Sequence, residues 1–274
     1  MKKISILSFI LLLLCCFTLT SCSDDESGTE TPKTISVKDA IDNIKREKNY
    51  RIKIETSLVD YENDKILSQQ EYKLEMLTKE DTRRIDITYS EVVITLYSII
   101  ENNVEYILFN LGMFDNDQPN KWIKATKDQI NTLINEKYEG QLSTNIFDLF
   151  SELFDFFKNT KNEYYVLNDV GNYEFNQTGK DALAIVVQDI LDEFLSTTDN
   201  PLSNGSNIDS KCTVRVNKKY VTNLLTDIYV IPVNTPNKKL VINSITSLDK
   251  FKEVEIKIPV DVVMYEDFVN SQDK

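Results

Sequence analysis

The fold is decided by residues 50–89, which read YRIKIETSLVDYENDKILSQQEYKLEMLTKEDTRRIDITY. Apolar and polar residues alternate in this segment over 50–54, 72–76 and 85–89. Because successive side chains of a strand point to opposite faces of a sheet, each run predicts a strand with one apolar and one solvated face. The polar stretches between the runs predict hairpin connections, so the segment predicts an antiparallel meander.

The meander is expected to continue toward the C-terminus. Residues 92–100 and 104–111 are more uniformly apolar, which is typical of central strands covered on both faces. Further strands are expected over 164–167, 173–175, 212–216, 220–231, 240–248 and 251–258.

Helices are expected before and between these strands. Ser36 is expected to cap a helix that ends near residue 48, and Thr126-Lys-Asp-Gln129 is a capping-box pattern that opens another. Thr178 is expected to cap a third helix that ends near residue 195. The order of helix, strands, helices and strands predicts an α+β fold with an antiparallel sheet.

The most hydrophobic of the expected helices covers residues 146–157, IFDLFSELFDFF. The simpler explanation of its broad apolar face is packing on the concave face of a sheet. The functional alternative is that the helix forms the wall or gate of a pocket for acyl chains. If it forms a pocket, the candidate wall residues are Leu149, Phe150, Leu153, Phe154 and Phe157.

The N-terminus has the features of a targeting signal. Lys2 and Lys3 precede an apolar stretch over 4–14 that is too short to span a hydrocarbon core of roughly 30 Å. Leu19-Thr20-Ser21-Cys22 follows and resembles the lipobox of bacterial lipoproteins. The resemblance implies cleavage before Cys22 and attachment of lipid, with acyl chains such as palmitate, to its thiol. The alternative is a secretory peptide cut elsewhere, which leaves Cys22 a free thiol.

The expected domains follow from this signal. Residues 1–21 are the signal peptide, residues 22–34 are an acidic flexible tether without hydrophobic residues after Cys22, and residues 35–268 form a single domain. An acidic run after the lipidated cysteine is also similar to the surface-export signal of Bacteroidota lipoproteins. The protein is therefore expected in the bacterial cell envelope, anchored to a membrane by lipid, with its domain in the periplasm or at the cell surface.

Composition excludes several functions. The chain has no His, which removes Ser-His-Asp, Cys-His and HExxH sites. Its formal charge is -13, and loss of Lys2 and Lys3 with the signal leaves 29 basic against 44 acidic groups, or -15. Such a charge argues against nucleic-acid binding, which is built largely from Lys and Arg.

The remaining reactive groups have simpler explanations. The acids over 189–193, and Glu152 with Asp155, have the spacing of a solvated helix face. Asp115-Asn116-Asp117 is similar to the first ligands of a calcium loop, but Asn120 stands where such a loop has its glycine and Thr126 where it has its bidentate Glu. Cys212 lies on the same face of its expected strand as Val214 and Val216, so it is expected to be a buried, inert thiol. We therefore expect no catalytic residue, no metal site and no cofactor.

The globular part resembles the lipoprotein-carrier superfamily in its order of elements over about 35–260. This group includes the periplasmic lipoprotein chaperones, their outer-membrane receptor and the mycobacterial lipid-carrying lipoproteins. The resemblance implies a curved antiparallel sheet, or half-barrel, whose concave face is covered by helices and holds acyl chains. The leading hypothesis is a non-enzymatic carrier of a lipid-like ligand. The alternative is a surface or periplasmic interaction or sensor module that binds a protein partner and no small molecule.

Overall fold

The computed structural model describes residues 35–89, 92–110, 121–130, 132, 155–195, 205–250 and 255–272. The first six strands are β1 (Asn49–Glu62), β2 (Lys65–Lys79), β3 (Thr82–Tyr89), β4 (Val92–Glu101), β5 (Val104–Asn110) and β6 (Trp122–Ala125). The others are β7 (Tyr165–Leu167), β8 (Tyr173–Phe175), β9 (Ser206–Val216), β10 (Val221–Pro232), β11 (Lys238–Lys250) and β12 (Val262–Met264). The helices are α2 (Val37–Lys45), α5 (Gln177–Leu195), α6 (Tyr265–Gln272) and the 3-10 turn η2 (Asn162–Tyr164), with short helical segments at 127–130 and 155–158.

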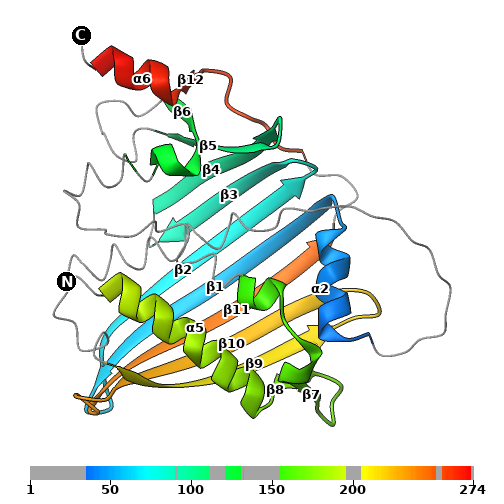
Figure 1. The fold of residues 1–274 in the computed structure, drawn as a ribbon, viewed down its shortest axis with the longest axis vertical. Coiled ribbons are helices and arrows are strands. Elements are labelled where there is room, and N and C mark those ends of the chain that lie inside the picture. The colour runs from blue at the N-terminus through cyan, green and yellow to red at the C-terminus, as the bar shows by residue number, and fades with distance from the viewer. Residues whose placement is uncertain are drawn as a thin grey trace.

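These strands form one large open sheet in the order β12-β6-β5-β4-β3-β2-β1-β11-β10-β9-β8-β7 (Figure 1). All pairs are antiparallel except β12 with β6. Strand β1 is the link between the two groups of strands, because Ile52 lies opposite both Met76 of β2 and Leu248 of β11. The expected antiparallel sheet with a few helices is confirmed.

Tight turns explain why the N-terminal meander forms locally. Asn63 and Asp64 join β1 to β2 with φ angles of 51° and 60°, and Asn102 and Asn103 join β4 to β5 with 51° and 63°. Two consecutive residues with positive φ make the turn whose twist matches antiparallel strands, and Asn and Asp tolerate this conformation. The polar stretch over 60–64 predicts a five-residue connection between β1 and β2. The connection is shorter, because β1 continues to Glu62.

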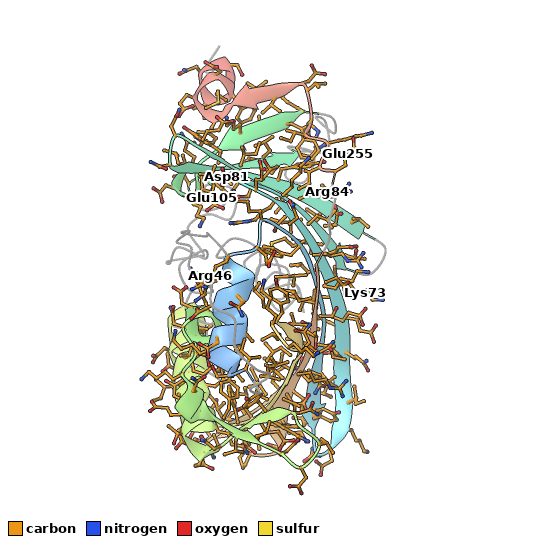
Figure 2. The ribbon with its side chains drawn as sticks, turned by 90° about the vertical axis from the view of Figure 1, so that its right-hand side faces the viewer. Arg46, Lys73, Asp81, Arg84, Glu105 and Glu255 are labelled. Carbon is orange, nitrogen blue, oxygen red and sulfur yellow. The ribbon has the colours of Figure 1, made fainter. Side chains whose placement is uncertain are left out.

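Helices α2 and α5 pack on the same side of the sheet, which we call the helix face (Figure 1). Helix α2 contacts β9 and β10, and α5 contacts β8 and β9. The opposite side is the outer face, where Lys73 and Arg84 point away from α2 in Figure 2. The alternation of the sequence matches this division, because Leu74, Met76 and Ile85 are at most 3% exposed.

Three expectations need correction. The strands over 92–100 and 104–111 were expected to be covered on both faces. This holds for the centres of β4 and β5, but Val92 and Val93 at the start of β4 are 58% and 59% exposed. Residues 255–258 are not in a strand, and 251–254 lie outside the described residues. The cap of α5 is Asn176 and not Thr178, because the Asn176 carbonyl oxygen Oδ1 accepts the backbone N–H of Gly179 at 3.0 Å.

Candidate functional site

An apolar cavity of about 110 Å³ lies between α2, the helical segment 155–158 and the helix face of the sheet. It opens to solvent, and eight of its twelve lining side chains are purely hydrocarbon. Its lining residues come from α2, the 155–158 segment and five strands: Ile41, Ile44, Ile52, Phe157, Lys158, Tyr165, Val214, Val221, Thr222, Leu224, Thr246 and Leu248. We refer to it below as the apolar cavity.

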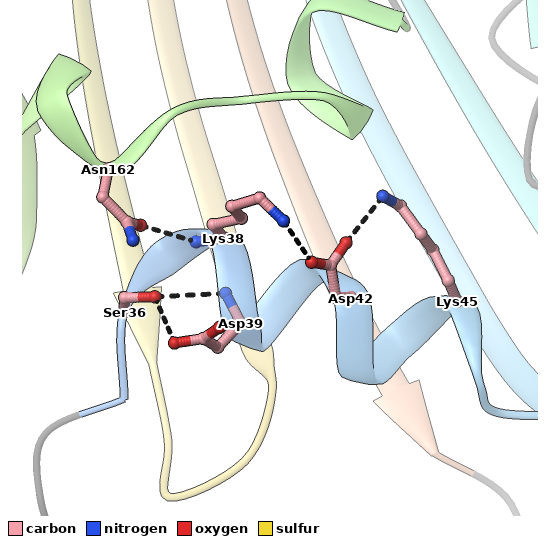
Figure 3. Close-up of polar contacts among 6 residues, drawn as sticks. All are labelled: Ser36, Lys38, Asp39, Asp42, Lys45 and Asn162. Atoms are coloured by element: carbon pink, nitrogen blue, oxygen red, sulfur yellow. Dashed lines mark hydrogen bonds and ion pairs between the residues drawn. The ribbon is translucent and has the colours of Figure 1, made fainter. Parts of the chain in front are cut away.

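Local capping explains why α2 forms one wall of the cavity (Figure 3). The Ser36 hydroxyl accepts the backbone N–H of Asp39 at 3.2 Å and donates to the Asp39 carboxylate at 2.6 Å. The backbone N–H of Lys38 donates to Asn162 Oδ1 at 3.2 Å, which ties the first turn of α2 to η2. The cap predicted at Ser36 is therefore confirmed, and it helps to hold the apolar side of α2 against the sheet.

The solvent side of α2 carries an ion-pair network. The Asp42 carboxylate lies 2.7 Å from both the Lys38 and the Lys45 ammonium (Figure 3). Burial raises the pKa of Asp42, but hydrogen bonds from Lys38 and Lys45 outweigh it and hold the pKa below its usual range. The charges thus satisfy each other on the side of α2 that faces away from the cavity.

Stacked aromatic rings form the second wall. The Phe157 ring stacks on Phe175 with centroids 6.5 Å apart, and Phe156 stacks on Tyr164 at 5.7 Å. The Tyr165 hydroxyl shares a 2.8 Å hydrogen bond with Thr160, and burial raises the pKa of Tyr165, so its phenol stays neutral. These contacts hold the 155–158 segment on β7 and β8.

The predicted site residues are placed as follows. Phe157 lies in the lining of the apolar cavity. The other four candidate wall residues, Leu149, Phe150, Leu153 and Phe154, lie outside the described residues, as does Cys22. Their roles stay predictions.

The lining also contains residues that were expected only as core. Ile52, Val214, Leu224 and Leu248 share the apolar parity of their strands, which the alternation predicts. The alternation does not predict that β1 pairs with β11 or that β9 pairs with β10. These pairings bring the four side chains together around the apolar cavity.

The groups considered for catalysis lie elsewhere. Cys212 is fully buried, and burial raises its thiol pKa to about 12. Asp155, Asp189 and Asp192 are exposed. Within the part of the chain that the structure describes, no group of three His, Cys, Asp or Glu residues could hold a metal ion.

A buried ion cluster lies on the helix face of β3, β4 and β5, away from the apolar cavity. The Arg83 side chain is 4% exposed, and its Nη1 atom lies 3.3 Å from Oε1 of Glu105. The Ser98 hydroxyl donates to the same carboxylate at 2.6 Å, and the Lys127 ammonium lies 3.1 Å from its second oxygen. The Glu105 carboxylate therefore has three partners, Arg83, Ser98 and Lys127, and such a fully paired buried charge is typical of a structural cluster.

Comparison with known proteins gives no relative from which a role could be taken. No protein-family model matches the chain, and no curated protein matches it either. Among the helices of the described residues, none is long and apolar enough to cross a membrane.

Proposed function

We propose that the protein is a membrane-anchored bacterial lipoprotein that binds a hydrophobic, lipid-like ligand on the helix face of a half-barrel. The observation that carries the proposal is the apolar cavity, which opens to solvent between α2 and the aromatic wall. An apolar group that leaves water for such a cavity gains about 0.8 kcal/mol per buried methylene. The long strands β1 and β2, which bend in Figure 2, and the helices on one face support the half-barrel.

The size of the cavity limits what it holds. Its volume of about 110 Å³ is below the roughly 300–1,000 Å³ that is usual for small-molecule sites. The cavity therefore suits the end of one acyl chain and not a whole lipid. A longer chain would enter by displacing α2 or the 155–158 segment, since both pack on the sheet through side chains.

Membrane attachment belongs to the same proposal. The lipid would be carried by Cys22, and the tether 22–34 has a maximum reach of roughly 43–47 Å for its 13 residues. The first described residue, Ile35, accepts a hydrogen bond from the Tyr173 hydroxyl at 3.0 Å, so the folded part begins beside β8. The tether would leave the domain free to approach the membrane or to face away from it.

The test uses the soluble Cys22→Ser form without residues 1–21. Native mass spectrometry after gentle purification, followed by organic extraction, would detect a co-purified lipid, and titration with palmitic acid would measure uptake. A Thr246→Phe variant places a ring in the cavity and should lower palmitate uptake. The matched control is Thr213→Phe on the outer face of β9, which should leave uptake unchanged. No lipid and no uptake by the folded protein would contradict the proposal.

A second candidate is the interaction module. Two observations favour it: the small volume of the cavity, and the exposed apolar side chains at one end of the sheet. Ile66, Leu67 and Val233 are 56%, 61% and 55% exposed, and the hairpins that carry them are joined by a 2.8 Å hydrogen bond from the Asn63 N–H to the Asn237 carbonyl. A clean mass without ligand, together with no palmitate uptake, would favour this candidate.

A further inference from the structure

Two hairpins meet at one end of the sheet, and together they carry three exposed aliphatic side chains (Figure 1). Ile66 and Leu67 follow the turn between β1 and β2, and Val233 lies in the connection from β10 to β11. We call this end, residues 60–68 and 231–239, the sheet tip. Turns usually carry polar residues, so aliphatic side chains that are more than half exposed on both hairpins require an explanation.

Hydrogen bonds hold the sheet tip in one shape. The Asn63 N–H donates to the Asn237 carbonyl at 2.8 Å, which joins the two hairpins to each other. The Val233 N–H donates to the Gly205 carbonyl at 3.1 Å, which joins the second hairpin to the start of β9. The tip therefore presents its aliphatic side chains on a braced backbone.

Leu67 is displaced from the strand ladder by a bulge. In the pairing of β1 with β2, Asp60 lies opposite Ser68. The next residue, Tyr61, lies opposite Ile66, so Leu67 has no partner residue on β1. A bulge of this kind bends the strand and changes the direction of its side chains, and Leu67 is 61% exposed.

The charge of the sheet tip differs from that of the whole chain. Three acidic and three basic residues cancel in the tip: Asp60, Glu62, Asp64, Lys65, Lys238 and Lys239. The whole chain, by contrast, has a formal charge of -13. Anionic lipids repel an acidic surface, but they do not repel a neutral one.

The tip also has an aromatic residue of the kind found at membrane surfaces. The Lys239 ammonium lies 4.7 Å from the centre of the Tyr61 ring. Both side chains have an apolar body and a polar end, which suits the boundary between acyl chains and headgroups. The tip thus combines aliphatic, aromatic and balanced charged side chains.

The tether is long enough for this end of the sheet to reach a membrane. The folded part begins at Ile35, whose carbonyl accepts a hydrogen bond from Tyr173 of β8. Through the register of β8, β9 and β10, Tyr173 lies in the same row as Leu224. The end of β10 at Pro232 is eight residues further, or about 27 Å along the strand. The tether over 22–34 spans roughly 43–47 Å at most, so the tip can touch the membrane that holds the start of the tether.

We propose that the sheet tip docks on the lipid bilayer to which the chain is anchored, with Ile66, Leu67 and Val233 inserted at the boundary of the acyl chains. This inference rests on the membrane attachment proposed above. Insertion removes the three aliphatic side chains from water. The short tether keeps the tip at a high local concentration near the bilayer, so a contact that is weak by itself becomes populated. The contact would give the domain one orientation on the membrane.

A protein partner, as in the interaction module, is the competing occupant of the sheet tip. A stable protein interface buries about 800 Å² and 20–30 residues on each side. Three aliphatic side chains on two protruding hairpins are too few for such an interface. A fluid bilayer needs no matching shape, because lipid molecules close around whatever protrudes into them. The observations therefore favour the bilayer.

The test anchors the protein to vesicles without using the natural lipid. The form without residues 1–21 keeps the Cys22 thiol, which couples to a maleimide-bearing lipid in vesicles of phosphatidylethanolamine and phosphatidylglycerol. Cys212 is fully buried, so it is not coupled in the folded protein. Part of the phospholipid carries brominated acyl chains, which quench the fluorescence of an inserted tryptophan. We expect them to remove about half or more of the fluorescence added by Leu67→Trp, because this ring enters the acyl boundary.

The matched control is Val93→Trp, which places the same ring at a site with the same exposure. Val93 is 59% exposed, against 61% for Leu67. It lies opposite Thr88, which lies opposite Lys73, so its row is six residues from Leu67 along β2, or about 20 Å. The fluorescence added by Val93→Trp should not be quenched, and the unchanged protein gives the signal of Trp122 to be subtracted.

Two results would overturn the proposal, provided that circular dichroism shows a folded protein. One is no quenching of the fluorescence added by Leu67→Trp. The other is equal quenching in Leu67→Trp and Val93→Trp, which would mean that the domain approaches the vesicle without preference for the tip. Mass spectrometry of the full chain tests lipid on Cys22 separately, so failure of the natural anchor and failure of docking are distinguishable. The tip shares no residue with the apolar cavity, so palmitate uptake should be the same in Leu67→Trp and in the unchanged protein.

Discussion

The substitution Glu105→Gln should destabilise the protein by about 3 kcal/mol. It keeps the shape of the side chain but removes the charge that faces Arg83 at 3.3 Å and Lys127 at 3.1 Å. Removing one partner of a buried ion pair typically costs about 3–5 kcal/mol, because the other charge is left buried and uncompensated. We use the lower end of this range because the side chains of Glu105 and Lys127 are 15% and 35% exposed.

Thermal and urea unfolding of the Cys22→Ser form would measure this loss. For a domain of this size, 1 kcal/mol shifts the Tm by roughly 2–4 °C, so we expect a decrease of about 6–12 °C. Trp122, the one tryptophan of the chain, packs edge-on against Tyr97 at 5.5 Å and reports on β4 and β6 by fluorescence. Far-UV circular dichroism should give the same transition if unfolding is two-state.

Two further variants separate burial from charge. Glu163→Gln removes one partner of the Lys161–Glu163 pair, whose side chains are 63% and 64% exposed, and should change stability by no more than about 0.5 kcal/mol. Replacing both Arg83 and Glu105 by Met and Leu should recover much of the loss, since neither charge is then left alone. If Glu105→Gln were no more destabilising than Glu163→Gln, the reasoning from burial would be wrong.

The remaining predictions concern three other parts of the fold. Asn176→Ala should cost about 1–2 kcal/mol in urea unfolding, because it removes the cap of α5, whereas Thr178→Ala on the exposed first turn should be nearly neutral. The Cys212 thiol, with its pKa of about 12, should not react with a disulfide reagent at pH 8 until the protein unfolds, and fast reaction of the native protein would contradict its burial. Asp42→Asn should lower stability by about 0.5 kcal/mol at pH 7. Because the pKa of Asp42 is lowered in the folded state, this difference should shrink as pH falls below about 4, and a difference that persists at pH 2 would contradict the ion-pair origin.

Local signals in the sequence predict much of the fold. The alternation over 50–89 gives the parity of β1, β2 and β3, and the Ser36 cap gives α2. The capping box at 126–129 is also found, since the Thr126 N–H donates to the Gln129 side chain at 2.8 Å and the Gln129 N–H donates back to the Thr126 hydroxyl at 3.4 Å. Each of these signals depends on residues close together in the chain, where a hydrogen bond or a side-chain direction follows from spacing alone.

The misses share a different cause. Asn176 and Thr178 are both acceptable cap residues, and only the entry of the chain from β8 decides between them. Strand β12 is three residues long and pairs in parallel with β6, so it has too few residues for an alternating pattern to appear.

The same reasoning explains why the apolar cavity is the feature least accessible to the sequence. Its lining comes from α2, the 155–158 segment and five strands, and it depends on the register that places Ile52 opposite Leu248. Because side chains alternate between faces, a one-residue slip of β11 against β1 would turn Leu248 to the outer face and replace it with a polar neighbour. The hydrophobic pattern of each strand would survive such a slip, but the cavity would not. Any function that depends on the cavity is therefore specified by the pairing of β1 with β11 and not by a motif in either strand.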